Sequence, residues 1–264
     1  MDLGISNRSA LVTGSTVGIG YAIALQLALE GVEVIVNGRT QARVDQALQS
    51  IRAAVPHAKL QGVALDLASE ASATALIAKY PAIDILVNNL GIYEPRPFAE
   101  ISDAEWLKMF EVNVLSGARL ARLYTPGMKQ RGWGRVIFIS SESGVNIPQE
   151  MIHYGMSKAA QLAISAGLAK DCAGTGVTSN SILVGPTASE GVDSFVNQLA
   201  KERGISREEM DAEFFRSGRP SSLLKRFIQP EEVANLVAYV ASERSSATTG
   251  AGLRVDGGLV SYIV

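Results

Sequence analysis

The segment from Ser9 to Gly20 restricts most strongly how this chain folds. A short apolar run at 9–12 leads directly into a glycine-rich segment at 13–20, with the sequence TGSTVGIG. An amphipathic stretch over 21–30 follows, so the predicted order is strand, glycine-rich turn and helix. Glycines permit a tight turn and close backbone approach, and the helix N-terminus offers unpaired N–H groups to a pyrophosphate. The alternative interpretation is an ordinary strand-to-helix turn without a ligand.

The same alternation of strand and helix continues along the chain. Strands that alternate with helices predict a parallel sheet with helices on both faces, and ligands bind such sheets at the carboxyl ends of the strands. The expected fold class is therefore α/β, a Rossmann-type doubly wound sheet of seven parallel strands. We expect these strands at 9–12, 32–36, 60–65, 83–87, 135–139, 177–184 and 252–255.

The composition fits one domain over residues 1–264, without a linker or an internal repeat. Hydrophobic residues make up 47% of the chain and charged residues 19%, which is enough for a sizeable core. The net charge of −2 gives no electrostatic reason to bind nucleic acid or an anionic membrane. The single cysteine, Cys172, fits a reducing compartment. No signal peptide, spanning segment or metal site is expected, so we predict a cytoplasmic protein.

The end of the second predicted strand carries the signal for cofactor choice. NAD-specific sites have an acidic residue about 20 residues past the glycine turn, where it binds the ribose 2′-hydroxyl. Here that position is Gly38, and Arg39 follows it. An arginine holds a 2′-phosphate through two hydrogen bonds, so NADP(H) is favoured over NAD(H). The alternative for Arg39 is a solvated residue at the start of the next helix.

Polar residues follow the next two strands as well. Asp66 comes after the strand at 60–65, where it either bonds an adenine amino group or caps the helix that starts near residue 69. Asn88 and Asn89 follow the strand at 83–87. Because parallel strands end at the same edge, these side chains are expected to gather with Gly14 and Arg39.

Tyr154 and Lys158 are four residues apart in a segment predicted to be helical as far as residue 173. That spacing places both side chains on one helix face. An ammonium group near a phenol favours the phenolate and lowers the tyrosine pKa from its usual value of about 10. A tyrosine tuned in this way exchanges a proton near neutral pH. His153 is adjacent to Tyr154 and does not share that face.

Together these residues resemble the short-chain dehydrogenase/reductase family over essentially the whole chain. The resemblance rests on the glycine turn, the NNLG segment at 88–91, and four residues in the family's order: Asn113, Ser141, Tyr154 and Lys158. It implies hydride transfer between a nicotinamide cofactor and a carbonyl or alcohol. Tyr154 is then the general acid/base and Lys158 lowers its pKa and binds the nicotinamide ribose. Ser141 holds the substrate oxygen, and Asn113 positions a water.

The resemblance also implies a set of cofactor-binding residues: Gly14, Ser15, Thr16, Gly18, Ile19, Gly20, Arg39, Asp66, Leu67, Asn89, Gly91, Tyr154, Lys158, Gly185 and Thr187. Two positions depart from the family pattern. Leu90 replaces the family's alanine, which predicts a slightly repacked loop beside the cofactor. Val184 replaces the proline before Gly185, although the glycine of that turn is kept.

Three further segments bear on the substrate and its access. Residues 93–101 either line a substrate entrance or form a plain connection. Asn113 lies in a long predicted helix that begins after Ser102, where an asparagine suggests a bent helix with a bound water. The segment 187–227 breaks the alternation and is a candidate lid over the substrate.

The overall pattern is similar to 3-oxoacyl-carrier-protein reductases and to small sugar or polyol dehydrogenases. The resemblance implies a homotetramer built from two long helices and the last strand, with a small-molecule substrate. A non-catalytic NADP-binding regulator on the same fold is the alternative of a different class. Such regulators typically lose the tyrosine or the lysine, whereas Tyr154 and Lys158 are both present here.

Overall fold

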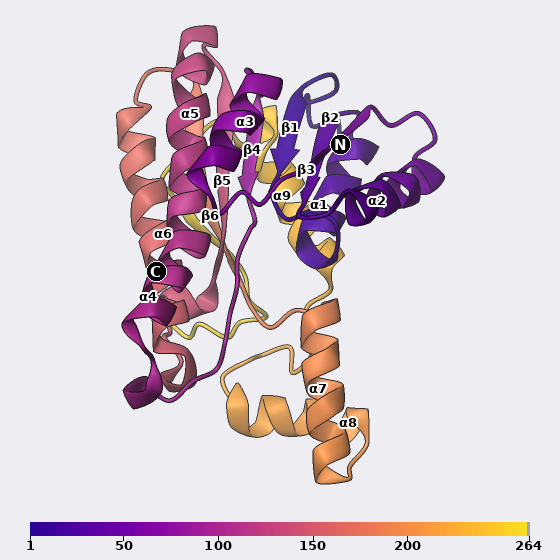
Figure 1. The fold of residues 1–264 in the computed structure, drawn as a ribbon, viewed down its shortest axis with the longest axis vertical. Coiled ribbons are helices and arrows are strands. Elements are labelled where there is room, and N and C mark those ends of the chain that lie inside the picture. Colours follow the sequence, from indigo (N-terminus) through magenta and orange to yellow (C-terminus); the bar gives the residue numbers. More distant parts are fainter. Residues whose placement is uncertain (263–264) are drawn as a thin grey trace.

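Each predicted apolar run forms a strand, and the strands pair in parallel in one sheet of order β3-β2-β1-β4-β5-β6-β7 (Figure 1). The computed structural model describes residues 1–262, with only the backbone described at five positions of one helix (190, 191, 194, 195 and 199). The strands are β1 Ser9–Val12, β2 Glu33–Gly38, β3 Leu60–Ala64, β4 Ile85–Asn88, β5 Gly134–Ser141, β6 Val177–Val184 and β7 Gly252–Val255. The predicted fold class is confirmed.

Helices cover both faces of the sheet (Figure 1). One layer consists of α1 (Gly18–Leu29), α2 (Gln41–Ala54) and α9 (Pro230–Val240), and the other includes α3 (Glu70–Lys79), α5 (Ser116–Arg131) and α6 (Ile152–Asp171). Successive strand side chains point to opposite faces, so each strand supplies both layers. In β1, Ala10 and Val12 join the first hydrophobic core and Leu11 joins the second. Burial on both faces explains why the central strands β1 and β4 read as mainly apolar runs, whereas the edge strand β7 is only partly buried.

Several element boundaries differ from the predicted ones. Helix α1 begins at Gly18, three residues before the amphipathic pattern starts. Strand β5 continues through Ser141, because Ser140 and Ser141 still pair with Leu183 and Val184 of β6. Backbone hydrogen bonding, rather than apolar side chains, therefore determines where this strand ends.

The long predicted helix around Asn113 is interrupted. It consists of α4 (Asp103–Phe110), a π-helical turn (Glu111–Leu115) and α5. Ser102 and Glu105 form a reciprocal cap at the start of α4. A π-helical turn inserts an extra residue into the helix and often marks a functional site. This turn explains how a buried asparagine is accommodated within the helical run.

The segment 187–227 extends below the sheet layers (Figure 1). It contains α7 (Glu190–Arg203), α8 (Arg207–Glu213) and a π-helical turn at Phe214–Gly218. A separate hydrophobic cluster holds it together, formed by Val196, Ala200, Met210, Phe215 and Phe227. The remaining short turns are 3-10 helices at Phe98–Glu100, Glu142–Gly144, Gln149–Met151 and Glu243–Ser245.

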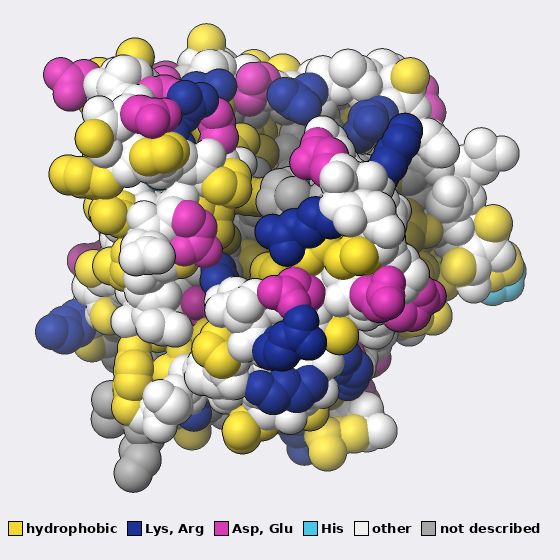
Figure 2. Space-filling view, turned by 90° about the horizontal axis from the view of Figure 1, so that it is seen from below, with side chains coloured by type: hydrophobic (Ala, Val, Ile, Leu, Met, Phe, Trp, Pro, Cys, Tyr) yellow, Lys and Arg dark blue, Asp and Glu magenta, His cyan; other side chains and the backbone are white. Residues whose placement is uncertain are grey.

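The face that carries this segment shows acidic and basic side chains interspersed (Figure 2). Such a surface lacks the continuous positive field that nucleic-acid-binding faces present. Within residues 1–262, no helix combines the length and apolar character needed to cross a bilayer.

Candidate active site

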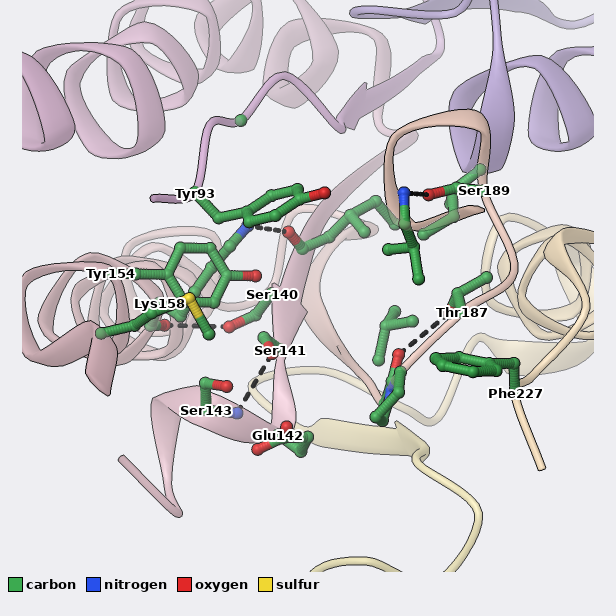
Figure 3. Close-up of a pocket in the computed structure, with 18 of the residues that line it drawn as sticks. Tyr93, Ser140, Ser141, Glu142, Ser143, Tyr154, Lys158, Thr187, Ser189 and Phe227 are labelled. Carbon is green, nitrogen blue, oxygen red and sulfur yellow. Dashed lines mark hydrogen bonds between the residues drawn. The ribbon is translucent and has the colours of Figure 1, made fainter. Parts of the chain in front are cut away.

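A pocket of about 390 Å³ lies at the carboxyl edge of the sheet, between the strand ends and segment 187–227. Figure 3 shows Tyr154 and Ser141 on one side of this pocket and Thr187 and Phe227 on the other. The predicted site residues that line it are Ile19, Asn89, Gly91, Ser141, Tyr154, Lys158, Gly185 and Thr187. Of the positions expected to gather at this edge, Asn89 lines the pocket, whereas Gly14, Arg39, Asp66 and Asn88 are outside its lining.

Polar side chains from neighbouring strands hold the glycine-rich turn. Asn89 Nδ2 donates to the carbonyl oxygens of Thr13 (2.9 Å) and Gly14 (3.1 Å). The Thr13 hydroxyl accepts from the N–H groups of Asn89 and Leu90, both at 2.9 Å. The buried Asn37 amide accepts from Gly14 N at 3.1 Å. Sequence reasoning missed the roles of Asn37 and Thr13, although each is a polar residue ending an apolar strand.

The start of α1 is suited to an anion. No side chain caps this helix and its first turn holds no acidic residue, so its N–H groups and positive dipole end remain for a ligand. Gly20 allows the helix to approach the turn, since a Cβ there would lie 2.4 Å from the Gly14 carbonyl oxygen. Gly14 and Gly18 both have positive φ, of 60° and 58°. These residues fit the pyrophosphate of a dinucleotide.

Two of the residues predicted to bind the cofactor, Ser15 and Leu67, have buried side chains. The Ser15 side chain is buried and its hydroxyl donates to Val12 O at 2.7 Å, so it shapes the turn. Leu67 at the end of β3 packs into the second core. Thr16 lies against Gly38, where a Cβ would approach the Thr16 methyl group to 2.5 Å.

The ends of β2 and β3 carry the two predicted charged residues. Arg39 is exposed directly after β2. Asp66 is also exposed, and its carboxylate accepts from Ala68 N at 3.2 Å. Helix α3 is capped by Ser69, which accepts from Ser72 N, so the expectation that Asp66 caps this helix is wrong. The reason is local: the chain makes a turn at 66–68 before the helix begins.

Leu90 and Val184, the two residues that depart from the family pattern, are accommodated by local packing. Leu90 packs against the second core and lies beside the glycine turn, 3.7 Å from where a Gly14 Cβ would be. Val184 stays in β6 and pairs with Val255. Gly185 then packs tightly on the backbone of Asp256, and Thr187 donates to Gly185 O at 2.9 Å (Figure 3). The turn after β6 is therefore fixed without the proline.

Tyr154 and Lys158 share one helix face, as predicted, but their electrostatic relation differs from the expected one. Burial raises the pKa of Tyr154 to about 12, although hydrogen bonding with Ser141 opposes this shift. Lys158 Nζ lies 5.6 Å from the centre of the Tyr154 ring and donates instead to Ile139 O (2.8 Å) and Gln161 Oε1 (3.2 Å). The expected lowering of the Tyr154 pKa is therefore wrong for this geometry. Burial also lowers the pKa of Lys158 to about 8.

Asn113 lies behind Lys158 rather than on the pocket surface. Its side chain accepts from Ile92 N (2.8 Å) and donates to Ile92 O and Ser157 Oγ (both 2.9 Å). Its main-chain carbonyl accepts from Gln161 Nε2 at 2.6 Å. Asn113 thus ties the loop after β4 to α6. Gln161 was not predicted, although its spacing three residues after Lys158 puts it on the same helix face.

The pocket also contains a charged pair that sequence reasoning did not single out. Glu142, directly after Ser141, is only 3% exposed, and its Oε1 lies 3.6 Å from Arg219 Nε. Arg219 also pairs with Glu150 at 3.1 Å. Burial raises the pKa of Glu142 to about 6, while Arg219 and Ser143 favour its charged form. The only sequence signal was an acidic residue at the carboxyl end of a buried strand.

Comparison with known proteins agrees with this geometry. Residues 8–200 match the family model described as short chain dehydrogenase. The chain belongs to the short-chain dehydrogenase/reductase family. The predicted family is confirmed, and the chain is an oxidoreductase of that family.

Relatives match this chain over nearly its full length. It is 46% identical to YvaG, an uncharacterized oxidoreductase of Bacillus subtilis, over 100% of both chains. It is 32% identical to D-beta-hydroxybutyrate dehydrogenase of Cupriavidus necator, over 97% of this chain and 99% of the relative. The crystal structure of L-sorbose reductase from Gluconobacter frateurii, complexed with NADPH and L-sorbose, matches with a TM-score of 0.94. That match has 30% identity and covers 100% of both chains.

Proposed function

We propose that this chain reduces a ketone or aldehyde with NADPH, or oxidises the corresponding alcohol in reverse. The observation that carries the proposal is the meeting of Ser141, Tyr154 and Lys158 in one pocket beside the uncapped start of α1. The nicotinamide, when bound, supplies or accepts the hydride. The family relatives, including a reductase solved with NADPH, support the same reaction class.

The hydroxyl groups of Tyr154 and Ser141 act on the substrate oxygen. Hydride addition to a carbonyl leaves negative charge on that oxygen, and two converging donors stabilise it. Tyr154 then gives its proton to the oxygen as general acid. Because burial raises the pKa of Tyr154 to about 12, the phenol is protonated at neutral pH. The protonated phenol is the form that a general acid needs, so Tyr154 is able to protonate the substrate oxygen in carbonyl reduction.

The preference for NADP(H) rests on the end of β2. Arg39 is exposed there and Gly38 supplies no carboxylate to repel a 2′-phosphate. A guanidinium binds phosphate oxygens through strong charge-assisted hydrogen bonds. Asp66, at the end of β3, remains available to bond the adenine amino group.

We also propose that the chain acts as one domain in which segment 187–227 covers the substrate. Val192, Val196, Arg219 and Phe227 from this segment line the pocket, opposite the catalytic side chains. The separate hydrophobic cluster of the segment supports movement as a unit. Residues 263–264 of the proposed domain lie outside the described part of the chain.

A cytoplasmic homotetramer is proposed for the assembled protein. Leu107, Phe110 and Leu123 on α4 and α5 are exposed apolar residues, which supports contact between these helices of neighbouring copies. The free thiol of Cys172 is consistent with a reducing compartment. Sedimentation analysis is expected to show a species of about four 28.0 kDa chains. A species with the mass of one chain would contradict this assembly.

Oxidation of NADPH against a panel of ketones, aldehydes and 3-oxoacyl thioesters tests the proposed activity. Turnover of at least one carbonyl by the natural protein supports it, and a strong preference for 3-oxoacyl thioesters would identify the carrier-protein reductase alternative. Tight NADPH binding without turnover of any carbonyl would instead favour the non-catalytic regulator.

A further inference from the structure

The substrate end of the pocket combines apolar side chains and hydroxyl groups with one group of charged side chains. Its apolar lining includes Tyr93, Pro95, Met151, Val192, Val196, Phe214 and Phe227. Within this lining, Glu142 lies next to Ser141 (Figure 3). Arg219 of segment 187–227 approaches Glu142, with 3.6 Å between Nε and Oε1. A buried charged pair is costly unless its hydrogen-bonding capacity is used. We therefore considered what substrate group this pair binds.

Neither Glu142 nor Arg219 has its hydrogen-bonding capacity filled by the other. The 3.6 Å between Arg219 Nε and Glu142 Oε1 is longer than a direct hydrogen bond. Arg219 Nη1 donates elsewhere, to Glu150 (3.1 Å) and to Gly218 O (2.8 Å). A carboxylate accepts about four hydrogen bonds, so the oxygens of Glu142 retain capacity beyond Ser143 and Arg219. A hydroxyl group, which both donates and accepts, is complementary to such a pair.

The charges around the pair select against an anionic substrate. Glu142 and Glu150 are balanced by a single guanidinium, that of Arg219. Asp256 adds a further negative charge that acts on Glu142. A substrate carboxylate or phosphate here would be repelled at short range in a poorly solvated pocket. A neutral substrate avoids that repulsion.

We propose that the substrate is a neutral polyhydroxylated ketone or aldehyde, with a hydroxyl near the reacting carbonyl donating to Glu142 and accepting from Arg219. This inference rests on the proposed reductase function and specifies its substrate class. Ser141 and Tyr154 bind the carbonyl oxygen, and Glu142 directly follows Ser141 as the first residue of the 3-10 turn Glu142–Gly144, so adjacent residues contact both substrate groups. The rings of Tyr93 and Phe214 offer apolar surface to the carbon skeleton.

Erythrulose and 2-butanone test the assignment, because they share a four-carbon ketone skeleton and differ in hydroxyl groups. The natural protein is expected to prefer erythrulose in kcat/KM over both butanone and the anionic 2-oxobutyrate. Glu142→Gln is expected to lower kcat/KM for erythrulose about 10- to 100-fold, as loss of a charge-assisted hydrogen bond does, and for butanone less than about threefold. Glu231→Gln, an exposed site on α9, is the matched control.

Three results would overturn the assignment. Equal losses on erythrulose and butanone would show that Glu142 supports the whole site rather than a substrate hydroxyl. A natural protein that reduces butanone or 2-oxobutyrate as well as erythrulose would reject the substrate class while leaving the proposed reductase function intact. Absence of turnover with every carbonyl tested would reject both.

A second inference comes from the other side of Lys158. Gln161 is 1% exposed, and its amide joins Lys158 Nζ (3.2 Å) to the carbonyl of Asn113 (2.6 Å). The Gln161 amide therefore joins Lys158 to Asn113 directly, whereas the family resemblance implies that Asn113 positions a water. The Asn113 carbonyl belongs to the π-helical turn Glu111–Leu115, and the hydrogen bond from Gln161 joins that turn to α6. Lys158 is thereby linked to a fixed point of the backbone.

The surroundings of Lys158 make this link electrostatically important. Tyr154, on the same helix, is the titratable side chain against the ammonium group. The neighbours from other elements are neutral: the Ile139 carbonyl on β5, and Asn113 and Gly91 near the π-helical turn. Burial alone lowers the pKa of Lys158, with no carboxylate to oppose it. Neutral acceptors such as Gln161 Oε1 therefore hold the proton on Lys158.

We infer that Gln161 is a positioning residue that keeps Lys158 protonated during the proposed reaction. If charged Lys158 is the active form, activity falls as pH rises through its pKa. Gln161→Leu removes an acceptor and is expected to move this alkaline limb of kcat to lower pH. Gln161→Glu loses the N–H that donates to the Asn113 carbonyl but gives Lys158 a negatively charged acceptor, and is expected to move this limb to higher pH. Equal losses at all pH values in both variants would show a merely structural role and overturn the inference.

Discussion

Replacement of Tyr154 by phenylalanine is expected to lower kcat/KM for carbonyl reduction by about 10²- to 10⁴-fold, the usual contribution of a positioned proton donor. The ring keeps its place, because Tyr93 packs edge-on against it at 6.4 Å between ring centres. Only the hydroxyl that hydrogen-bonds with Ser141 is removed. Steady-state NADPH oxidation measures the loss.

Binding of NADPH to Tyr154→Phe separates catalysis from cofactor affinity. Fluorescence titration is expected to give a Kd within a few-fold of that of the natural protein. Of the predicted cofactor contacts only that of the Tyr154 hydroxyl is lost, while Lys158 and the glycine-rich turn are unchanged. Tyr239→Phe, which removes the hydroxyl group of an exposed tyrosine on α9, is the matched control. If Tyr154→Phe keeps a third or more of the activity, another group donates the proton.

Replacement of Arg39 by aspartate is expected to reverse the choice of cofactor. The ratio of kcat/KM with NADPH to that with NADH should fall about 100-fold or more. A guanidinium–phosphate contact contributes about 1.5–3 kcal/mol, and the new carboxylate both repels the 2′-phosphate and accepts from a 2′-hydroxyl. The measurement is initial rate against each cofactor at saturating carbonyl.

Two further variants make the Arg39 result specific. Arg39→Gln removes the charge without adding repulsion, so its effect on the ratio should be smaller than that of aspartate. Arg52→Asp makes the same charge change at the opposite end of α2 and should leave the ratio unchanged. An unaltered ratio in Arg39→Asp would exclude Arg39 from recognition of the 2′-phosphate.

The sequence was sufficient to predict the sheet and the gathering of the site. Buried parallel strands are recognisable as apolar runs, and strand β1 was predicted at its observed bounds. Strands β6 and β7 were also predicted at their observed bounds, although β6 holds four consecutive polar residues and β7 is only partly buried. The glycine turn and the residues after each strand met because parallel strands end at one edge. Ser141, Tyr154 and Lys158 therefore reached one pocket without knowledge of the structure.

What the sequence did not reveal depends on contacts between distant segments. Helical spacing placed Lys158 beside Tyr154, but the direction of its long side chain is set by Ile139 and Gln161. The pKa of Tyr154 consequently follows burial rather than the neighbouring ammonium. The contact between Arg219 and Glu142 could not be predicted either, because no pattern in segment 187–227 indicates which part of the sheet edge it lies against.

The separate cluster of segment 187–227 has a consequence for how the molecule responds to substrate. Because Val196, Met210 and Phe227 pack apart from the two sheet cores, the segment is able to unfold locally at a lower free energy than the whole chain. A substrate held between Glu142 and Arg219 binds only while the segment is folded, and so raises that local unfolding free energy. The rate of amide hydrogen exchange in α7 and α8 is therefore expected to fall as substrate fills the pocket. It measures the fraction of protein with bound substrate even when no turnover takes place.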